Sequence, residues 1–209
     1  MFGGVIKLAA DVDGIIYPFV DAFREWLGDP NLPEPTTFAF ASEWGIADTD
    51  FPRLVTEFGE EGGYSKLAPY ADVVDALSRC DAMGIDVLAV TSRPATRVVL
   101  RSTMAWFAEH EIPVRGLELC CDKTMIDAHV LIDDDPSVYA AVESTDECVP
   151  ILLARSWNGG GVERRGDWES ILAALGLAIE AMSETPDMDD AERRWLLGDI
   201  FDESLLAQE

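Results

Sequence analysis

Short apolar runs recur along the chain, and each ends in a polar or acidic turn. The first covers residues 4–10 (GVIKLAA) and stops at the sequence DVDG. Its length and its flanking glycines favour a buried strand over a helix. We expect the same structure for the similar runs at residues 85–91, 114–120, 128–133 and 149–154.

Segments with apolar positions at helical spacing separate these strands. Residues 71–84, 95–110 and 136–144 show the pattern, and Pro94 and Pro136 stand near the expected helix starts. Alternating strands and helices are typical of a mainly parallel sheet that is covered on both faces. The predicted fold class is therefore α/β.

Two segments interrupt this alternation and predict separate units. Residues 14–70 contain aromatic residues, prolines and short helical pieces, and they are too many for an ordinary connection. We expect them to form a small helical cap on a core made of residues 1–13 and 71–175. Residues 176–209 form an acidic tail with an apolar set around Trp195. We favour a tail helix that docks on the core, and a partner-binding helix is the alternative.

The composition describes an acidic globular chain. Its 209 residues allow one core and a small subdomain. With 40 acidic and 15 basic residues the formal charge is -25, which repels polyanions, so we expect no polymeric nucleic acid as partner. No segment is apolar enough for a membrane span or a secretory leader, so we expect a cytoplasmic protein. The oligomeric state stays open, a homodimer included.

Cysteine and histidine residues form no recognisable site in the sequence. The four cysteines include no CxxC pair and have no histidine at ligand spacing, which gives a structural zinc site little support. His110 and His129 belong to no catalytic pattern. Asn158 and the glycines at 159–161 lack the GK[ST] sequence of a phosphate-binding P-loop, so we interpret them as a mobile surface loop.

The strongest candidate for chemistry is the sequence Asp11-Val12-Asp13-Gly14 at the end of the first strand. Residues two apart on an extended segment point the same way, so both carboxylates can face one centre beyond the sheet edge where α/β folds bind ligands. Magnesium relieves the repulsion between such carboxylates. One aspartate can then attack phosphorus while the other transfers protons. A turn or helix cap is the alternative interpretation.

Three more polar groups follow later strands. The sequence TSR at 91–93 offers hydroxyls, amides and a guanidinium to a phosphate, or else caps a helix. Lys123 can neutralise phosphate charge and orient a nucleophile, or it is an ordinary exposed lysine. Three adjacent carboxylates at residues 133–135, at the end of an apolar strand, cost free energy unless a cation binds there. The alternative is a solvated acidic turn. Chance seldom places four such groups in this order at strand ends.

This order is the signature of the haloacid dehalogenase superfamily, and the chain resembles its 5'(3')-deoxyribonucleotidase family. DVDGIIYPF, TSR, DKTMIDAHVLIDDD, SWN and DW carry the resemblance, which runs from about Val5 to Leu172. Phage and actinobacterial relatives also resemble TTFAFASEWGIADTDF. The resemblance implies a Rossmann-like core with a cap inserted after the first motif. It also implies a magnesium-dependent phosphatase that acts through an aspartyl-phosphate on a small phosphomonoester, with a nucleoside or deoxynucleoside monophosphate as the expected substrate.

The resemblance further implies a role for individual residues. Asp11 would be the nucleophile and Asp13 the general acid and base. Mg²⁺ would be held by the Asp11 side chain, the Asp13 carbonyl and Asp134, with support from Asp133. The phosphoryl group would bind to Thr91, Ser92 and Lys123, beside the guanidinium that Arg93 offers. Phe19 falls where the family places an aromatic side chain against the base, and Trp44 is a second candidate; packing between cap and core is the alternative for both.

Departures from the family pattern concern the substrate and not the catalytic groups. Asp127-Ala128-His129 replaces the usual glycine ahead of the last motif, and Pro69-Tyr70-Ala71 replaces an expected Pro-Gly. Two other functions stay open. LIDDDPSV also resembles polynucleotide end phosphatases, which the net charge disfavours, and a non-catalytic protein of this fold could bind a partner through the acidic tail.

Overall fold

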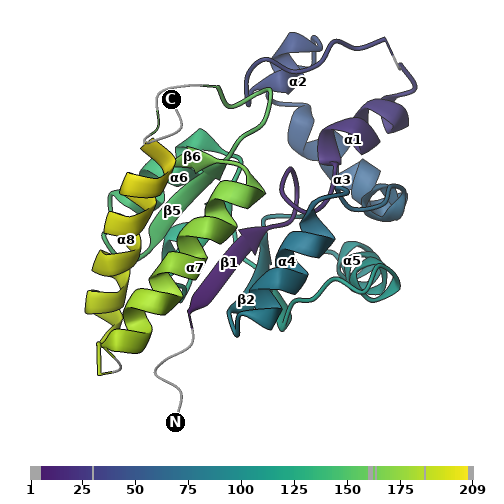
Figure 1. Cartoon of the computed structure of the whole chain (residues 1–209). Helices are drawn as coiled ribbons and strands as arrows, with labels where there is room; N and C mark the ends of the chain where they lie inside the picture. Colours follow the sequence, from purple (N-terminus) through teal and green to yellow (C-terminus); the bar gives the residue numbers. More distant parts are fainter. Residues whose placement is uncertain (1–5, 30, 160–161, 163, 186, 207–209) are drawn as a thin grey trace.

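A six-stranded parallel sheet forms the centre of the molecule in the computed structural model, which describes residues 6–29, 31–159, 162, 164–185 and 187–206 (Figure 1). Within these residues the strand order is β3-β2-β1-β4-β5-β6, and every neighbouring pair is parallel. The predicted α/β class with a parallel sheet is confirmed. The strands are β1 (Lys7–Asp11), β2 (Asp86–Thr91), β3 (Gly116–Leu119), β4 (Val130–Asp133), β5 (Val149–Leu153) and β6 (Arg165–Gly166).

Alternate residues of the strands enter two hydrophobic cores, one on each face of the sheet. In β1, Leu8 and Ala10 belong to the larger core, while Ala9 belongs to the smaller one. This alternation is what a strand buried on both faces requires. The larger core also contains side chains of α4 (Val73–Ala82), α5 (Arg97–Glu109), α7 (Trp168–Glu184) and α8 (Asp190–Leu206). The smaller core contains Val142 of α6 (Pro136–Glu143).

The cap lies beyond the carboxyl end of β1, as Figure 1 shows. It consists of α1 (Phe19–Leu27), α2 (Phe40–Glu43), α3 (Phe51–Glu60) and the 3-10 helix η1 (Gly63–Ser65). Aromatic rings fill its interior: the ring centroid of Phe58 lies 5.5 Å from Phe19, 5.5 Å from Phe23 and 4.9 Å from Tyr64. The two chain segments that join cap and core meet where the Tyr70 amide donates to the Ile16 carbonyl (3.1 Å).

The C-terminal helix packs along α7 and closes one side of the core (Figure 1). Leu197, Phe201 and Leu205 of α8 are buried, whereas Trp195 is 71% exposed. The predicted boundary at residue 176 falls inside α7, because a capping box at Asp167 begins one continuous helix that runs to Glu184. None of the helices in the described ranges is long and apolar enough to cross a bilayer.

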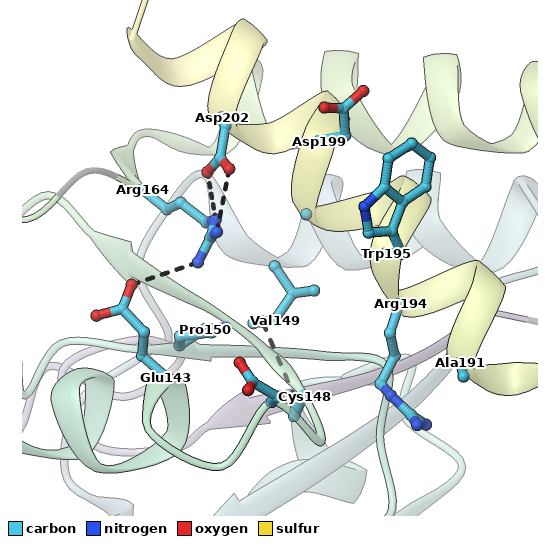
Figure 2. Close-up of a pocket in the computed structure, with 12 residues that line it drawn as sticks. Glu143, Cys148, Val149, Pro150, Arg164, Ala191, Arg194, Trp195, Asp199 and Asp202 are labelled. Atoms are coloured by element: carbon cyan, nitrogen blue, oxygen red, sulfur yellow. Dashed lines mark hydrogen bonds and ion pairs between the residues drawn. The ribbon is translucent and has the colours of Figure 1, made fainter.

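A cavity of about 410 Å³ lies between α8, the start of β5 and the end of α6. In Figure 2 Arg164 contacts two of the acidic side chains of this cavity: its Nε lies 2.6 Å from an Asp202 carboxylate oxygen, and its Nη1 lies 3.5 Å from Glu143. The cavity adjoins Val149 at the first residue of β5. It therefore lies toward the opposite end of the strands from the edge where parallel α/β sheets bind ligands.

Candidate active site

A tight turn after β1 brings Asp11 and Asp13 to the carboxyl edge of the sheet. The Val12 carbonyl accepts from the amides of Ile16 (2.9 Å) and Tyr17 (2.7 Å), which curls the chain directly after the strand. Gly14 adopts a φ of +86°, and a Cβ at this position would lie 2.1 Å from an Asp134 carboxylate oxygen. Only glycine leaves room for that carboxylate, so the turn and the end of β4 fit together at this residue.

Lys123 connects two of the predicted site carboxylates. Its Nζ lies 2.7 Å from Asp11 Oδ1 and 2.6 Å from Asp133 Oδ2, and the lysine side chain is only 7% exposed. Burial raises the pKa of Asp11 to about 7, against the opposing effect of Lys123. Burial alone would lower the pKa of Lys123, but the two carboxylates outweigh it and raise that pKa. The lysine therefore stays protonated beside Asp11.

Three buried carboxylates fit a divalent cation. One oxygen each of Asp11, Asp133 and Asp134 lies within 4.8 Å of the other two. Burial, with the nearby Asp133 and Asp11, raises the pKa of Asp134 well above its usual value. The single ammonium of Lys123 leaves an excess of negative charge when all three are ionised. Hard oxygen donors with unbalanced charge are what Mg²⁺ binds.

Asp133 differs from the other two carboxylates in its hydrogen bonds. Its Oδ1 accepts from the Asp135 amide (2.9 Å), and its Oδ2 accepts from Lys123 (2.6 Å). Both oxygens are thus engaged within the protein. The arrangement suits Asp133 to hold the lysine and the turn after β4, which leaves Asp11 and Asp134 as the carboxylates better placed to face a cation.

The loop after β5 holds Asp134 from the other side. Trp157 Nε1 donates to Asp134 Oδ2 (2.8 Å), and Asn158 Nδ2 donates to the Asp134 carbonyl (3.0 Å). The guanidinium of Arg155 donates to the Gly14 carbonyl (2.6 Å) from the same loop. The interpretation of Asn158 as part of a mobile surface loop was wrong, because its side chain is buried in these contacts. Residues 160 and 161 lie outside the described residues.

The TSR sequence begins at the last residue of β2, and its three side chains make different contacts. Ser92 is exposed and lines a cavity above the carboxylates. Thr91 is buried, and its hydroxyl accepts from the Arg93 amide (3.2 Å). The Arg93 guanidinium is directed at Asp13, with Nη2 2.7 Å from Oδ1 and Nε 2.8 Å from Oδ2. Arg93 also borders this cavity, but its side chain is 0% exposed, so Ser92 is the side chain of the three that is open to a ligand.

A cavity of about 490 Å³ joins the carboxylates to the cap. One end is polar, with Asp11, Asp13, Ser92, Lys123 and Asp134 among its walls. The cap end is apolar and is formed by Phe19, Val20, Phe38, Phe40, Phe51, Val55 and Tyr64. An anionic group and an apolar or aromatic group can therefore be held side by side.

The two aromatic candidates from the sequence have different surroundings. Phe19 lines the cavity and also stacks on Phe23, with ring centroids 5.4 Å apart, so it takes part in cap packing as well. Trp44 belongs to the cap, but it is not among the described residues that line the cavity. Its indole donates to the Pro33 carbonyl (2.9 Å) and packs on Phe40. Residue types alone did not predict that other aromatic side chains of the cap line the cavity, namely Phe38, Phe40, Phe51 and Tyr64. They also did not predict the contacts of Trp157 and Asn158 with Asp134.

Comparison with known proteins places this geometry in a family. The profile of the family described as "5' nucleotidase, deoxy (Pyrimidine), cytosolic type C protein" matches residues 5–177. A curated protein of Chlorobaculum tepidum, described as "Putative 5'(3')-deoxyribonucleotidase", is 25% identical over 177 residues, which is 73% of this chain and 86% of that protein. The match to the family covers the core, the cap and most of α7, and it ends before α8.

Solved structures share the fold at low sequence identity. A crystal structure of a "putative beta-phosphoglucomutase" from Thermotoga maritima has a TM-score of 0.52 at 16% identity, over 83% of this chain and 99% of that one. A "putative phosphoglycolate phosphatase" from Lactobacillus delbrueckii subsp. bulgaricus has a TM-score of 0.52 at 13% identity, over 84% and 99%. The family match extends over more than three quarters of the sequence and includes every residue of the carboxylate cluster. The chain therefore belongs to the family of 5' nucleotidase, deoxy (pyrimidine), cytosolic type C proteins, and it is a phosphatase.

Proposed function

We propose that the protein is a magnesium-dependent nucleotidase that hydrolyses deoxynucleoside monophosphates in the cytoplasm through an aspartyl-phosphate on Asp11. The observation that carries the proposal is the two-ended cavity, in which buried carboxylates and Lys123 face an aromatic cap wall. A phosphate fits the first end, and a flat base fits the second. The description of the Chlorobaculum tepidum relative supports the same substrate class.

The first half of the reaction transfers the phosphoryl group to the enzyme. An Asp11 carboxylate oxygen attacks phosphorus, the bond from phosphorus to the ester oxygen breaks, and Asp13 gives its proton to that oxygen. Lys123, 2.7 Å from Asp11, orients the nucleophile and offsets phosphoryl charge together with the Ser92 hydroxyl. A Mg²⁺ ion held by Asp11, Asp134 and the Asp13 carbonyl would neutralise negative charge on the phosphate.

The second half restores the enzyme. Asp13 takes a proton from water, the water oxygen attacks phosphorus, and the bond to Asp11 breaks to release inorganic phosphate. The cap covers the reacting groups during this step, because its aromatic side chains form the cavity wall opposite the carboxylates. Phe19 and its neighbours provide a surface against which the base of the substrate packs.

A panel of phosphate monoesters, assayed with magnesium and with a chelator, tests the proposal. We expect deoxynucleotides to be the best substrates and the chelator to abolish turnover. Asp11→Asn should fold normally and lose activity by about 10³-fold or more, as expected for the loss of a catalytic nucleophile. The matched control is Asp127→Asn, because Asp127 is exposed and pairs only with Lys7 among the described residues.

Each result has a distinct meaning. Preference for sugar phosphates over nucleotides would contradict the nucleotidase while leaving the phosphatase in place. Turnover that a chelator leaves unchanged would contradict the role of the metal. An Asp11→Asn variant with the activity of the Asp127→Asn control would remove the nucleophile from the scheme.

A further inference from the structure

Arg93 is a charged side chain of the site whose contacts all lie inside the protein. Its side chain is 0% exposed, and its Nε and Nη2 bind the two oxygens of Asp13 at 2.8 and 2.7 Å. Its Nη1 donates to the Thr103 hydroxyl of α5 at 2.9 Å. All three nitrogens of the guanidinium therefore have a partner inside the protein. The two parallel N–H groups that a bidentate phosphate contact would need already bind Asp13.

Two tyrosines lie against the guanidinium of Arg93. Its central carbon is 4.1 Å from the ring centroid of Tyr64 and 5.1 Å from that of Tyr17. Tyr64 belongs to η1 of the cap, and Tyr17 belongs to the turn after β1. In such cation–π contacts the ring attracts the cation, and here the two rings hold the planar guanidinium in place. The cap and the core thus meet at Arg93.

We propose that Arg93 is a positioning residue for Asp13 and is not a ligand of the phosphoryl group. The inference rests on the proposed function, in which Asp13 transfers protons. The bidentate contact with Arg93 fixes the plane of the Asp13 carboxylate. The contacts with Thr103 and Tyr64 fix the Arg93 guanidinium in turn. The Asp13 side chain is 23% exposed, so the carboxylate keeps an open side while Arg93 holds the other. Because Tyr64 belongs to the cap, the position of Arg93, and through it that of Asp13, depends on how the cap packs against the core.

The experiment compares an ester whose leaving group needs a proton with one whose leaving group does not. Deoxyuridine monophosphate releases an alkoxide that Asp13 must protonate, whereas p-nitrophenyl phosphate releases a stable phenolate. In Arg93→Lys we expect kcat for the nucleotide to fall about 10²-fold or more, the usual size of a proton-transfer contribution, with KM within a few-fold of wild type. The first turnover of p-nitrophenyl phosphate should keep its rate, and only later turnovers should slow.

A double-mutant cycle separates this role from a structural one. If Arg93 acts through Asp13, adding Arg93→Lys to Asp13→Asn should produce no further loss for the nucleotide. Arg97→Lys, at the exposed start of α5, is the control and should behave as wild type in both assays. Thr103→Val removes the hydrogen bond to Arg93 Nη1 at a buried residue outside the cavity wall. It should show the same leaving-group dependence as Arg93→Lys with a smaller loss, and it decides the matter if Arg93→Lys does not fold.

Three outcomes would overturn the proposal. A higher KM at unchanged kcat would make Arg93 a phosphate ligand. Equal losses for both esters, the first turnover included, would make its role structural. Additive losses in the cycle would mean that Arg93 does not act through Asp13. If wild type cleaves p-nitrophenyl phosphate but no nucleotide, the nucleotidase fails, and the comparison still holds with whichever alkyl phosphate the enzyme prefers.

Discussion

Asp134 shows how the position of one carboxylate depends on distant parts of the chain. Its oxygen lies where only glycine at position 14 leaves room, and its other contacts come from Trp157 and Asn158, more than twenty residues further on. Outer contacts of this kind orient a ligand and tune its affinity for a metal. We therefore expect the indole of Trp157 to tune the proposed metal site through Asp134, although it supplies no metal ligand itself.

Trp157→Phe tests this role of the indole. The substitution removes the 2.8 Å hydrogen bond to Asp134 and keeps an aromatic ring in place. We expect the magnesium concentration for half-maximal activity to rise on the order of 10-fold to 100-fold, the usual effect of losing such an outer contact. Trp168→Phe is the matched control, because its buried Nε1 has no partner among the described residues. Equal magnesium dependence of the two variants would contradict the role.

Residue types and their order predicted which side chains would converge, but not what each would contact. Asp11, Lys123, Asp133 and Asp134 lie at or after the carboxyl ends of three different strands. Parallel strands bring these ends to one edge of the sheet, so the meeting of the four side chains could be foreseen. Arg93 follows a strand in the same way. Its direction toward Asp13 depends on Tyr64 and Thr103, whose positions only the folded cap and α5 define.

Helix α8 packs one face against the core and leaves another exposed. Phe201 is completely buried, whereas Trp195 of the same helix is 71% exposed. We expect Phe201→Ala to lower the free energy of unfolding by about 3–5 kcal/mol, because it empties a core position. Trp195→Ala should change it by no more than about 0.5 kcal/mol. Urea denaturation of both variants measures the difference, and a similar cost for the two would contradict the docking of α8.

A buried histidine makes the junction of β4 and α8 sensitive to acid. His129 Nδ1 accepts from the Lys7 amide (3.0 Å), and its Nε2 faces Asp190 of α8 at 3.5 Å. Burial lowers the pKa of His129, aided by Lys7 and Arg193 and opposed by Asp190. The unfolded chain binds the proton more readily, so this contribution to stability is complete above about pH 6.5 and is lost as pH falls below it.

His129→Asn measures that contribution, because asparagine retains an acceptor for Lys7 but does not titrate. Between about pH 7 and pH 5.5 the free energy of unfolding should fall more steeply for wild type than for the variant. The steeper fall should persist in His110→Asn, which removes the other histidine. Parallel pH profiles for wild type and His129→Asn would show that protonation of His129 does not affect stability.

Elements with strong periodicity were predictable, and short ones were not. The five apolar runs correspond to β1 through β5, and the periodic segments correspond to α4, α5 and α6. The two-residue strand β6 has no period to detect, and it forms because Leu152 and Leu153 of β5 provide the pairing edge. The cap was predicted as helical, but its helices are short and are held by contacts among aromatic rings, so their bounds follow from packing.

The strongly negative net charge of the chain and the capped cavity both favour a small substrate. The formal charge is -25, and the cavity measures about 490 Å³. We expect an oligonucleotide with a terminal phosphate to be hydrolysed about 100-fold or more less efficiently than a deoxynucleotide at low salt, because charge repulsion is strongest there. The same oligomer with neutral methylphosphonate linkages separates charge from size. Efficient cleavage of the charged oligomer would favour an end phosphatase instead.

In the proposed reaction, Asp11 carries the phosphoryl group between the two half-reactions. The most direct measurement is rapid acid quenching of the enzyme with magnesium and substrate, followed by peptide mass spectrometry. We expect a phosphoryl adduct on the peptide that contains Asp11, located at that residue and absent from Asp11→Asn. An adduct on any other residue, or rapid turnover with no adduct at any quench time, would contradict it.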